Sequence, residues 1–181
     1  MSLKIEQVHK YFVGEVSGID LSDPLSKSEV IQIEEGMDQF GVLIFREQFL
    51  SDEEQVSYTK NFGELELHVG SNVLKGNERR LSLEFADVSN LDQDGEILKK
   101  GDRRRMFNLG NRLWHTDSSF RNIPSKFSIL SCRSTPKVGG NTEFSFMPAV
   151  YDELEEGTKQ EIADLITCLL YTSDAADEYS G

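Results

Sequence analysis

The sequence predicts a mainly β fold, in which an antiparallel β core carries flanking helices. Two helical segments with start signals come early in the chain, and several short segments with strand-like patterns follow them. An order of helices and then strands is typical of helices packed at one side of an antiparallel sheet. With 181 residues, 38% of them hydrophobic, the chain can form one domain with its own core.

The N-terminal segment predicts short strands. Residues 3–19 alternate loosely between apolar and polar side chains, and Gly14 and Gly18 interrupt the alternation. Alternation of this kind indicates a strand with one buried face. The strands are expected to lead into a turn at Asp20–Pro24.

Two capping boxes predict the two early helices. Ser26 with Glu29, and Ser51 with Glu54, have the spacing at which two side chains satisfy free backbone N–H groups at a helix start. Gly41 suits the C-terminal cap of the first helix. The apolar run 42–45 that follows it fits a buried strand.

The second half of the chain carries the remaining predicted strands. They are residues 81–88, 107–114, 127–132 and 141–146, chosen for alternating or compact apolar patterns between turn residues. Asp94-Gly95 is a hairpin turn signal. A helical stretch is expected to open at Pro148.

Composition excludes several classes of protein. The net charge of −13 argues against a nucleic-acid partner, which needs a basic surface. No apolar run approaches a membrane span, and the first residues lack a signal-peptide pattern. Two cysteines make no disulfide framework, so a cytoplasmic protein is expected. The basic run Lys99–Arg105 is interpreted as a solvated loop.

Residues 168–181 are predicted not to be native protein. They resemble the translation of a transposon-end adapter used in sequencing libraries. The native part is therefore expected to be residues 1–167, the N-terminal part of a single domain.

A His and an Asp stand two positions apart in Leu113-Trp-His-Thr-Asp-Ser118. On an extended strand, His115 and Asp117 would point to the same face. One imidazole and one carboxylate are two of the three protein ligands in the facial triad of non-haem Fe(II) oxygenases. A solvated strand end is the alternative for the pair alone.

Further motifs give the pair a context. Asn111-Arg-Leu-Trp-His-Thr-Asp117, the strand 127–132, and Gly139-Gly-Asn-Thr142 follow one another, and Thr142 lies 27 positions after His115. Together with Val42–Arg46, Asn61–Leu65 and Ala86–Asn90, this pattern resembles the Fe(II)/2-oxoglutarate-dependent dioxygenases of the taurine dioxygenase and 2,4-dichlorophenoxyacetate dioxygenase family. The resemblance is greater to the phenoxyacetate branch.

The resemblance implies a double-stranded β-helix, or jelly roll, and a set of site residues. His115 and Asp117 would bind iron, and Thr142 would contact 2-oxoglutarate. Asn111, Ser119 and His68 are substrate-side candidates, although Ser119 also suits a turn and His68 a solvent-exposed loop. The family's second iron histidine and its 2-oxoglutarate-binding arginine would lie beyond the end of this sequence. The chain is thus expected to be a C-terminally truncated, inactive piece of the enzyme.

The expected function is hydroxylation of a small organic acid such as an aryloxyalkanoate, with release of succinate and CO2. The expected partners are then a small anionic substrate and O2, and neither nucleic acid nor a membrane is expected. The oligomeric state stays open, and a homo-oligomer is one of the possibilities. Three alternatives remain: a taurine or alkylsulfonate dioxygenase of the same family, a metal-dependent hydrolase, and a non-catalytic β domain that binds a small molecule or a partner.

Overall fold

The computed structural model describes residues 2–67, 79–119 and 121–166. The chain divides into two compact units. Unit 1 combines Met1–Gly63 with Ile129–Gly181, and unit 2 is Glu64–Ser128.

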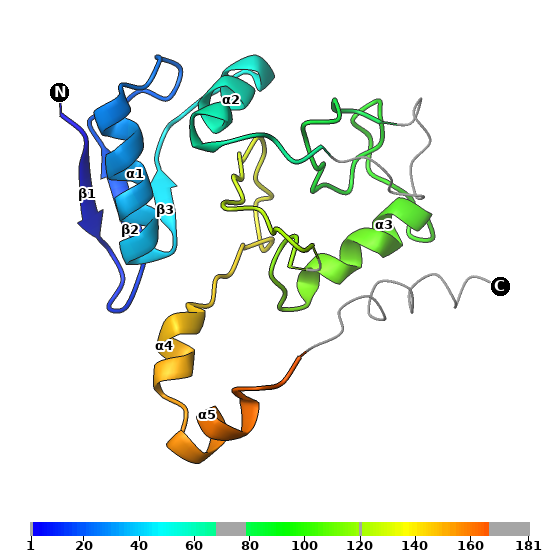
Figure 1. Cartoon of the computed structure of the whole chain (residues 1–181). Coiled ribbons are helices and arrows are strands. Elements are labelled where there is room, and N and C mark those ends of the chain that lie inside the picture. The colour runs from blue at the N-terminus through cyan, green and yellow to red at the C-terminus, as the bar shows by residue number, and fades with distance from the viewer. Residues whose placement is uncertain (1, 68–78, 120, 167–181) are drawn as a thin grey trace. The chain divides into compact units, whose positions relative to one another are not determined.

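Unit 1 contains a three-stranded sheet, and helix α1 (Lys27–Phe40) lies against it (Figure 1). Strand β1 (Lys4–Gln7) pairs antiparallel with β2 (Gly14–Ser17), and β2 pairs parallel with β3 (Leu43–Phe45). The predicted strands within residues 3–19 and 42–45 are therefore confirmed. The parallel pair is possible because a helix connects β2 to β3.

Helix α1 (Lys27–Phe40) is that connection, and its ends are formed by the predicted residues. The Ser26 hydroxyl accepts from the Glu29 backbone N–H, and the Glu29 carboxylate accepts from the Ser26 backbone N–H at 2.8 Å. At the other end, Gly41 adopts a left-handed conformation with φ 65° and donates its N–H to the Met37 carbonyl.

Helix α1 packs closely on the sheet because Gly36 has no side chain. A Cβ atom at Gly36 would lie 2.5 Å from a methyl carbon of Ile5 in β1 and 3.3 Å from one of Leu43 in β3. Ile33 of the same helix is 3% exposed and belongs to the core. The other core residues of this cluster are Leu3, Val16, Leu21, Leu50 and Tyr58.

Helix α2 (Asp52–Thr59) begins at the second predicted capping box and continues into the 3-10 turn η1 (Lys60–Phe62). Arg133, from the later part of unit 1, binds its N-terminal turn. The guanidinium donates to the Leu50 carbonyl, to the Asp52 carboxylate at 3.0 Å and to the Gln55 amide oxygen at 2.8 Å. These contacts join two segments that are about eighty residues apart in the sequence.

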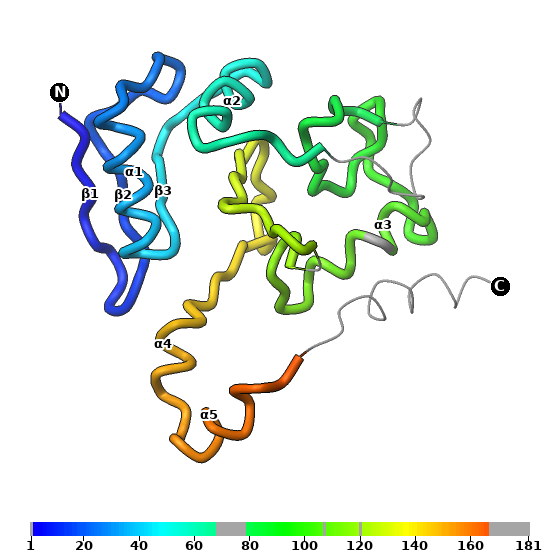
Figure 2. The backbone as a smooth tube through the Cα atoms, viewed as in Figure 1, coloured from blue at the N-terminus to red at the C-terminus, as the bar shows by residue number. Residues whose placement is uncertain are grey.

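Two strand predictions in unit 2 are wrong, and Figure 2 shows the backbone path there, including the coil of α3. Residues 81–88 form no strand, and residues 107–114 are mostly helical: α3 (Arg103–Asn108) leads directly into the 3-10 turn η3 (Leu109–Arg112). The Asp94-Gly95 turn is confirmed, since Leu91 and Ile97 form an antiparallel bridge across it. The apolar periodicity of 107–114 was assigned to the wrong element.

Residues 127–132 and 141–146 also form no strand. A strand exists only where a second strand completes its hydrogen-bond ladder, and among the described residues the sheet ends at three strands. Pro148 does open a helix, α4 (Met147–Asp152), which is followed by α5 (Glu156–Ile162). The predicted non-native residues 168–181 lie outside the described part of the chain.

The mainly β fold with flanking helices is thus seen only in part. The described residues form a small sheet with helices, and none of these helices is long and apolar enough to cross a membrane.

Candidate metal site

His115 and Asp117 lie side by side in unit 2. The imidazole Nε2 is 3.2 Å from the carboxylate Oδ1, and both side chains are about half exposed. The chain leaves η3 at Leu113, and residues 117–119 form a turn. The two side chains therefore meet between the end of η3 and this turn, where no strand is formed.

The orientation of the imidazole is fixed by a backbone bond. Nδ1 of His115 lies 2.7 Å from the carbonyl oxygen of Leu113. A carbonyl oxygen only accepts hydrogen bonds, so Nδ1 carries the proton. With Nδ1 bonded to the backbone, Nε2 is the ring nitrogen that faces Asp117, and a backbone bond of this kind is usual behind a metal-binding histidine.

The second carboxylate oxygen of Asp117, Oδ2, is bonded to a serine. The Ser128 hydroxyl donates to Oδ2 at 2.8 Å. This bond leaves Oδ1 facing His115. One oxygen is thus anchored by the protein and the other is directed at the imidazole.

The pair fits two neighbouring positions around a metal ion. Two ligand atoms at right angles, each about 2.1 Å from the ion, lie about 3 Å apart. The observed 3.2 Å is close to that separation. Within the described ranges, no group of three or more His, Cys, Asp or Glu side chains could hold a metal ion, so this part of the chain supplies two ligands at most.

The other predicted site residues fall in different places. Asn111 is exposed and lies in the 3-10 turn η3, not in the strand predicted for residues 107–114. The Ser119 hydroxyl donates to the Thr116 carbonyl at 3.0 Å, a bond within the turn. Thr142 is exposed and belongs to unit 1, just after Gly139 and Gly140 with φ 74° and 73°. His68 lies outside the described residues.

Trp114 and the basic run add little to the site. Trp114, which precedes His115, is 70% exposed. The run Lys99–Arg105 is partly helical rather than a loop, because α3 starts at Arg103. Arg104 forms an ion pair with Asp102 at 2.9 Å.

Two polar residues near the pair were missed in the sequence. Ser128 stands inside the apolar run 127–130, where a hydroxyl signals a polar contact. Glu66 accepts from the Ser118 hydroxyl at 2.7 Å, next to Asp117. Its position between Leu65 and Leu67 gave no comparable signal.

The sequence matches the model of the taurine catabolism dioxygenase TauD, TfdA family over residues 4–176. The chain belongs to this family. TauD/TfdA relatives include the alpha-ketoglutarate-dependent 2,4-dichlorophenoxyacetate dioxygenase of Burkholderia sp. strain RASC, 40% identical over 168 residues. The (S)-phenoxypropionate/alpha-ketoglutarate-dioxygenase of Sphingobium herbicidovorans is 30% identical over 152 residues.

A solved structure shows the same similarity. The crystal structure of AAD-2 in complex with Mn(II) and N-oxalylglycine matches 91% of this chain with a TM-score of 0.86 and 49% identity. The matches to the Burkholderia and Sphingobium enzymes cover 91% and 83% of this chain. In the other direction, the chain spans 57% of AAD-2, 55% of the Burkholderia enzyme and 47% of the Sphingobium enzyme. This member of the TauD/TfdA family thus corresponds to about half the length of its relatives.

Proposed function

We propose that this chain is the part of an Fe(II)- and 2-oxoglutarate-dependent dioxygenase that contains two of its iron ligands. The reaction would consume 2-oxoglutarate, O2 and a substrate C–H bond, and it would give succinate, CO2 and the hydroxylated substrate. The single observation that carries the proposal is the His115–Asp117 pair, with Nε2 and Oδ1 3.2 Å apart, in a member of the TauD/TfdA family.

The two ligands would have different roles. His115 would bind the metal through Nε2, because its Nδ1 proton is bonded to Leu113. Asp117 would supply the negative charge through Oδ1, with Oδ2 held by Ser128. A neutral nitrogen and one carboxylate suit Fe(II) and leave positions open for further ligands. We expect the third protein ligand and the 2-oxoglutarate arginine outside the described residues.

Bound iron and 2-oxoglutarate would supply the oxidising chemistry, in which one oxygen atom of O2 enters succinate and the other enters the substrate. The Thr142 hydroxyl is the proposed donor to a 2-oxoglutarate carboxylate, a bond that a short side chain can make at low entropy cost. The Mn(II) and N-oxalylglycine of AAD-2 support a metal with a 2-oxo acid, since N-oxalylglycine has the carboxylates and oxo group of 2-oxoglutarate. The complete fold is proposed to be a jelly roll.

The proposed substrate is an aryloxyalkanoate, a small carboxylate with an aromatic body. Two relatives, a 2,4-dichlorophenoxyacetate and a phenoxypropionate dioxygenase, support this class. Asn111, Ser119 and His68 stay the candidate substrate contacts. Because the chain is net negative, an anionic substrate needs local positive charge or the metal ion to offset repulsion.

Succinate release tests the proposal. The protein expressed from the gene is assayed with Fe(II), 2-oxoglutarate and a panel of aryloxyalkanoates, alkylsulfonates and alkyl sulfates. We expect aryloxyalkanoates to stimulate succinate release most. Asp117→Ala should reduce release to background, while Asp38→Ala, which removes an exposed carboxylate of α1, should not. If alkylsulfonates stimulate succinate release most, the aryloxyalkanoate assignment is wrong and the substrate is a sulfonate. If product forms without 2-oxoglutarate, the protein is the metal-dependent hydrolase.

A further inference from the structure

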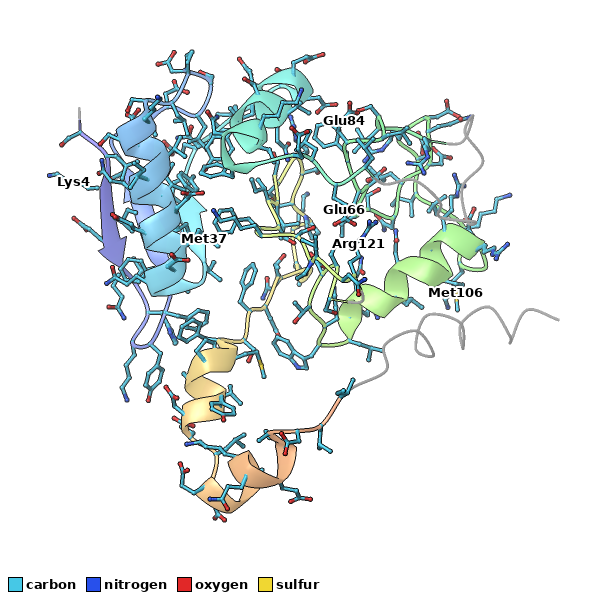
Figure 3. The ribbon with its side chains drawn as sticks, in the orientation of Figure 1. Lys4, Met37, Glu66, Glu84, Met106 and Arg121 are labelled. Atoms are coloured by element: carbon cyan, nitrogen blue, oxygen red, sulfur yellow. The ribbon has the colours of Figure 1, made fainter. Side chains whose placement is uncertain are left out.

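The Glu66 carboxylate collects three donors from the segment that follows the metal pair. Its Oε2 accepts from the hydroxyls of Ser118, at 2.7 Å, and of Ser125. Its Oε1 lies 2.8 Å from the Arg121 guanidinium. Figure 3 shows the side chains of Glu66 and Arg121 pointing toward one another. One carboxylate therefore binds three residues that lie more than fifty positions later in the sequence.

Ser118 is the residue that needs such support. Its φ is 53°, in the left-handed region that residues with a side chain rarely adopt. It directly follows Asp117, so a fixed position of Ser118 also fixes the peptide group on the C-terminal side of Asp117. A strained residue persists where surrounding contacts over-determine it, and the bond to Glu66 is such a contact.

We propose that Glu66 is a positioning residue for the metal site: it holds the Asp117–Ser119 turn in the shape that aims Asp117 Oδ1 at His115 Nε2. The inference rests on the proposed function, because it needs a metal ion at this pair. Glu66 acts through Ser118, to whose hydroxyl it is bonded.

The geometry distinguishes Glu66 from an ordinary surface ion pair. An exposed pair such as Arg46 with Glu15 joins two flexible side chains and contributes little. Glu66 instead binds two short serine side chains, which transmit position to the backbone because they have few rotatable bonds.

Mn(II) affinity tests the inference. The signal of free aqueous Mn(II) in electron paramagnetic resonance gives the dissociation constant during a titration at neutral pH. We expect Glu66→Ala to raise this constant about tenfold, the size of effect known for residues behind metal ligands. Ser118→Ala, which removes only one hydroxyl, should raise it by a similar factor, and the double variant should lose no more than the larger single loss.

Controls separate this inference from the proposed function. Glu15→Ala removes a comparable carboxylate from unit 1 and should leave the affinity unchanged. His115→Ala should abolish binding; if it does not, the proposed metal site is wrong. If His115→Ala abolishes binding but Glu66→Ala and Ser118→Ala bind Mn(II) like the unmodified protein, Glu66 has no positioning role. If the losses of Mn(II) affinity in the two single variants add up in the double variant, Glu66 does not act through its bond to Ser118, and the inference is equally overturned. Thermal melting of each variant shows that it is folded.

Discussion

The two oxygens of Asp117 have separate partners. Oδ1 faces the His115 imidazole at 3.2 Å, while Oδ2 accepts from Ser128 at 2.8 Å. A carboxylate that is free to rotate would lose conformational entropy when a metal ion binds. The Ser128 bond removes part of that cost before binding.

Ser128→Ala should therefore weaken metal binding. We expect the Mn(II) dissociation constant to rise about tenfold, because the carboxylate then has more orientations to lose. Ser131→Ala, a change of the same kind three residues along the chain, is the matched control and should have no effect. Equal affinity in both variants would contradict a role for the Ser128 hydroxyl.

A second carboxylate is strongly affected by its neighbour. The Arg104 side chain donates to Asp102 at 3.0 Å and 2.9 Å and, with the Arg104 backbone N–H, lowers the Asp102 pKa from 3.8 to about 2. Folding thus lowers the pKa of this carboxyl, so its contribution to stability is present above 3.8 and is lost as the pH falls toward 2.

Arg104→Gln should raise the Asp102 pKa toward its ordinary value of 3.8. The measurement is an NMR titration of the side-chain carboxyl. Arg103→Gln, the neighbouring change with the same loss of charge, should leave that pKa low. An unchanged titration in Arg104→Gln would show that the bond does not form in solution.

The elements are short, and their ends are determined locally. Helices α1 and α2 both start at a capping box whose bonds span three residues. By contrast, the packing of α1 requires a residue without a side chain at Gly36, where the helix backbone approaches Ile5 and Leu43. A larger residue there must displace β1 or β3 side chains.

Gly36→Leu should destabilise unit 1. Overpacking of a core contact costs about 1–3 kcal/mol, more than the gain in helix propensity over glycine. Urea unfolding gives the change in the free energy of unfolding. Gly157→Leu in α5, where a Cβ atom meets nothing within 4 Å, is the control and should be neutral or stabilising. A stabilised Gly36→Leu variant would refute the close approach.

At the scale of the whole molecule, the two units differ in how much they bury. Among the described residues, Leu98 is the one buried side chain of unit 2, and the other eight belong to unit 1. Local stability follows buried apolar contacts. The candidate metal pair therefore lies in the unit that has the smaller described core.

Amide hydrogen exchange should reflect this difference. We expect amides of α1 and β2 to exchange slowest and those of residues 113–119 to exchange fast. Saturating Mn(II) should slow exchange at 113–119, because a ligand that binds the folded state stabilises it. His115→Ala should show no such slowing. If Mn(II) does not change amide exchange at residues 113–119 of the unmodified protein, this segment does not bind the metal ion.

The strand predictions show where local pattern stops being sufficient. Residues 107–114 have an apolar pattern that suits either element, and here they form α3 and η3. Residues 141–146 also read as a strand, but a strand requires a partner whose distance in sequence the pattern does not contain. His115 and Asp117 were expected to point to one place, and their side chains lie 3.2 Å apart although no strand is formed there.

The sequence by itself determined what depends on neighbours within a few residues: the capping boxes at Ser26 and Ser51, the Gly41 cap, and a His and an Asp close enough to face one metal ion. It also determined the family, through the order and spacing of its motifs. Only the tertiary structure decided which residues support the pair. Glu66 reaches Ser118 across 52 positions, and such a contact depends on the path of the backbone between them, which no local pattern of side chains specifies.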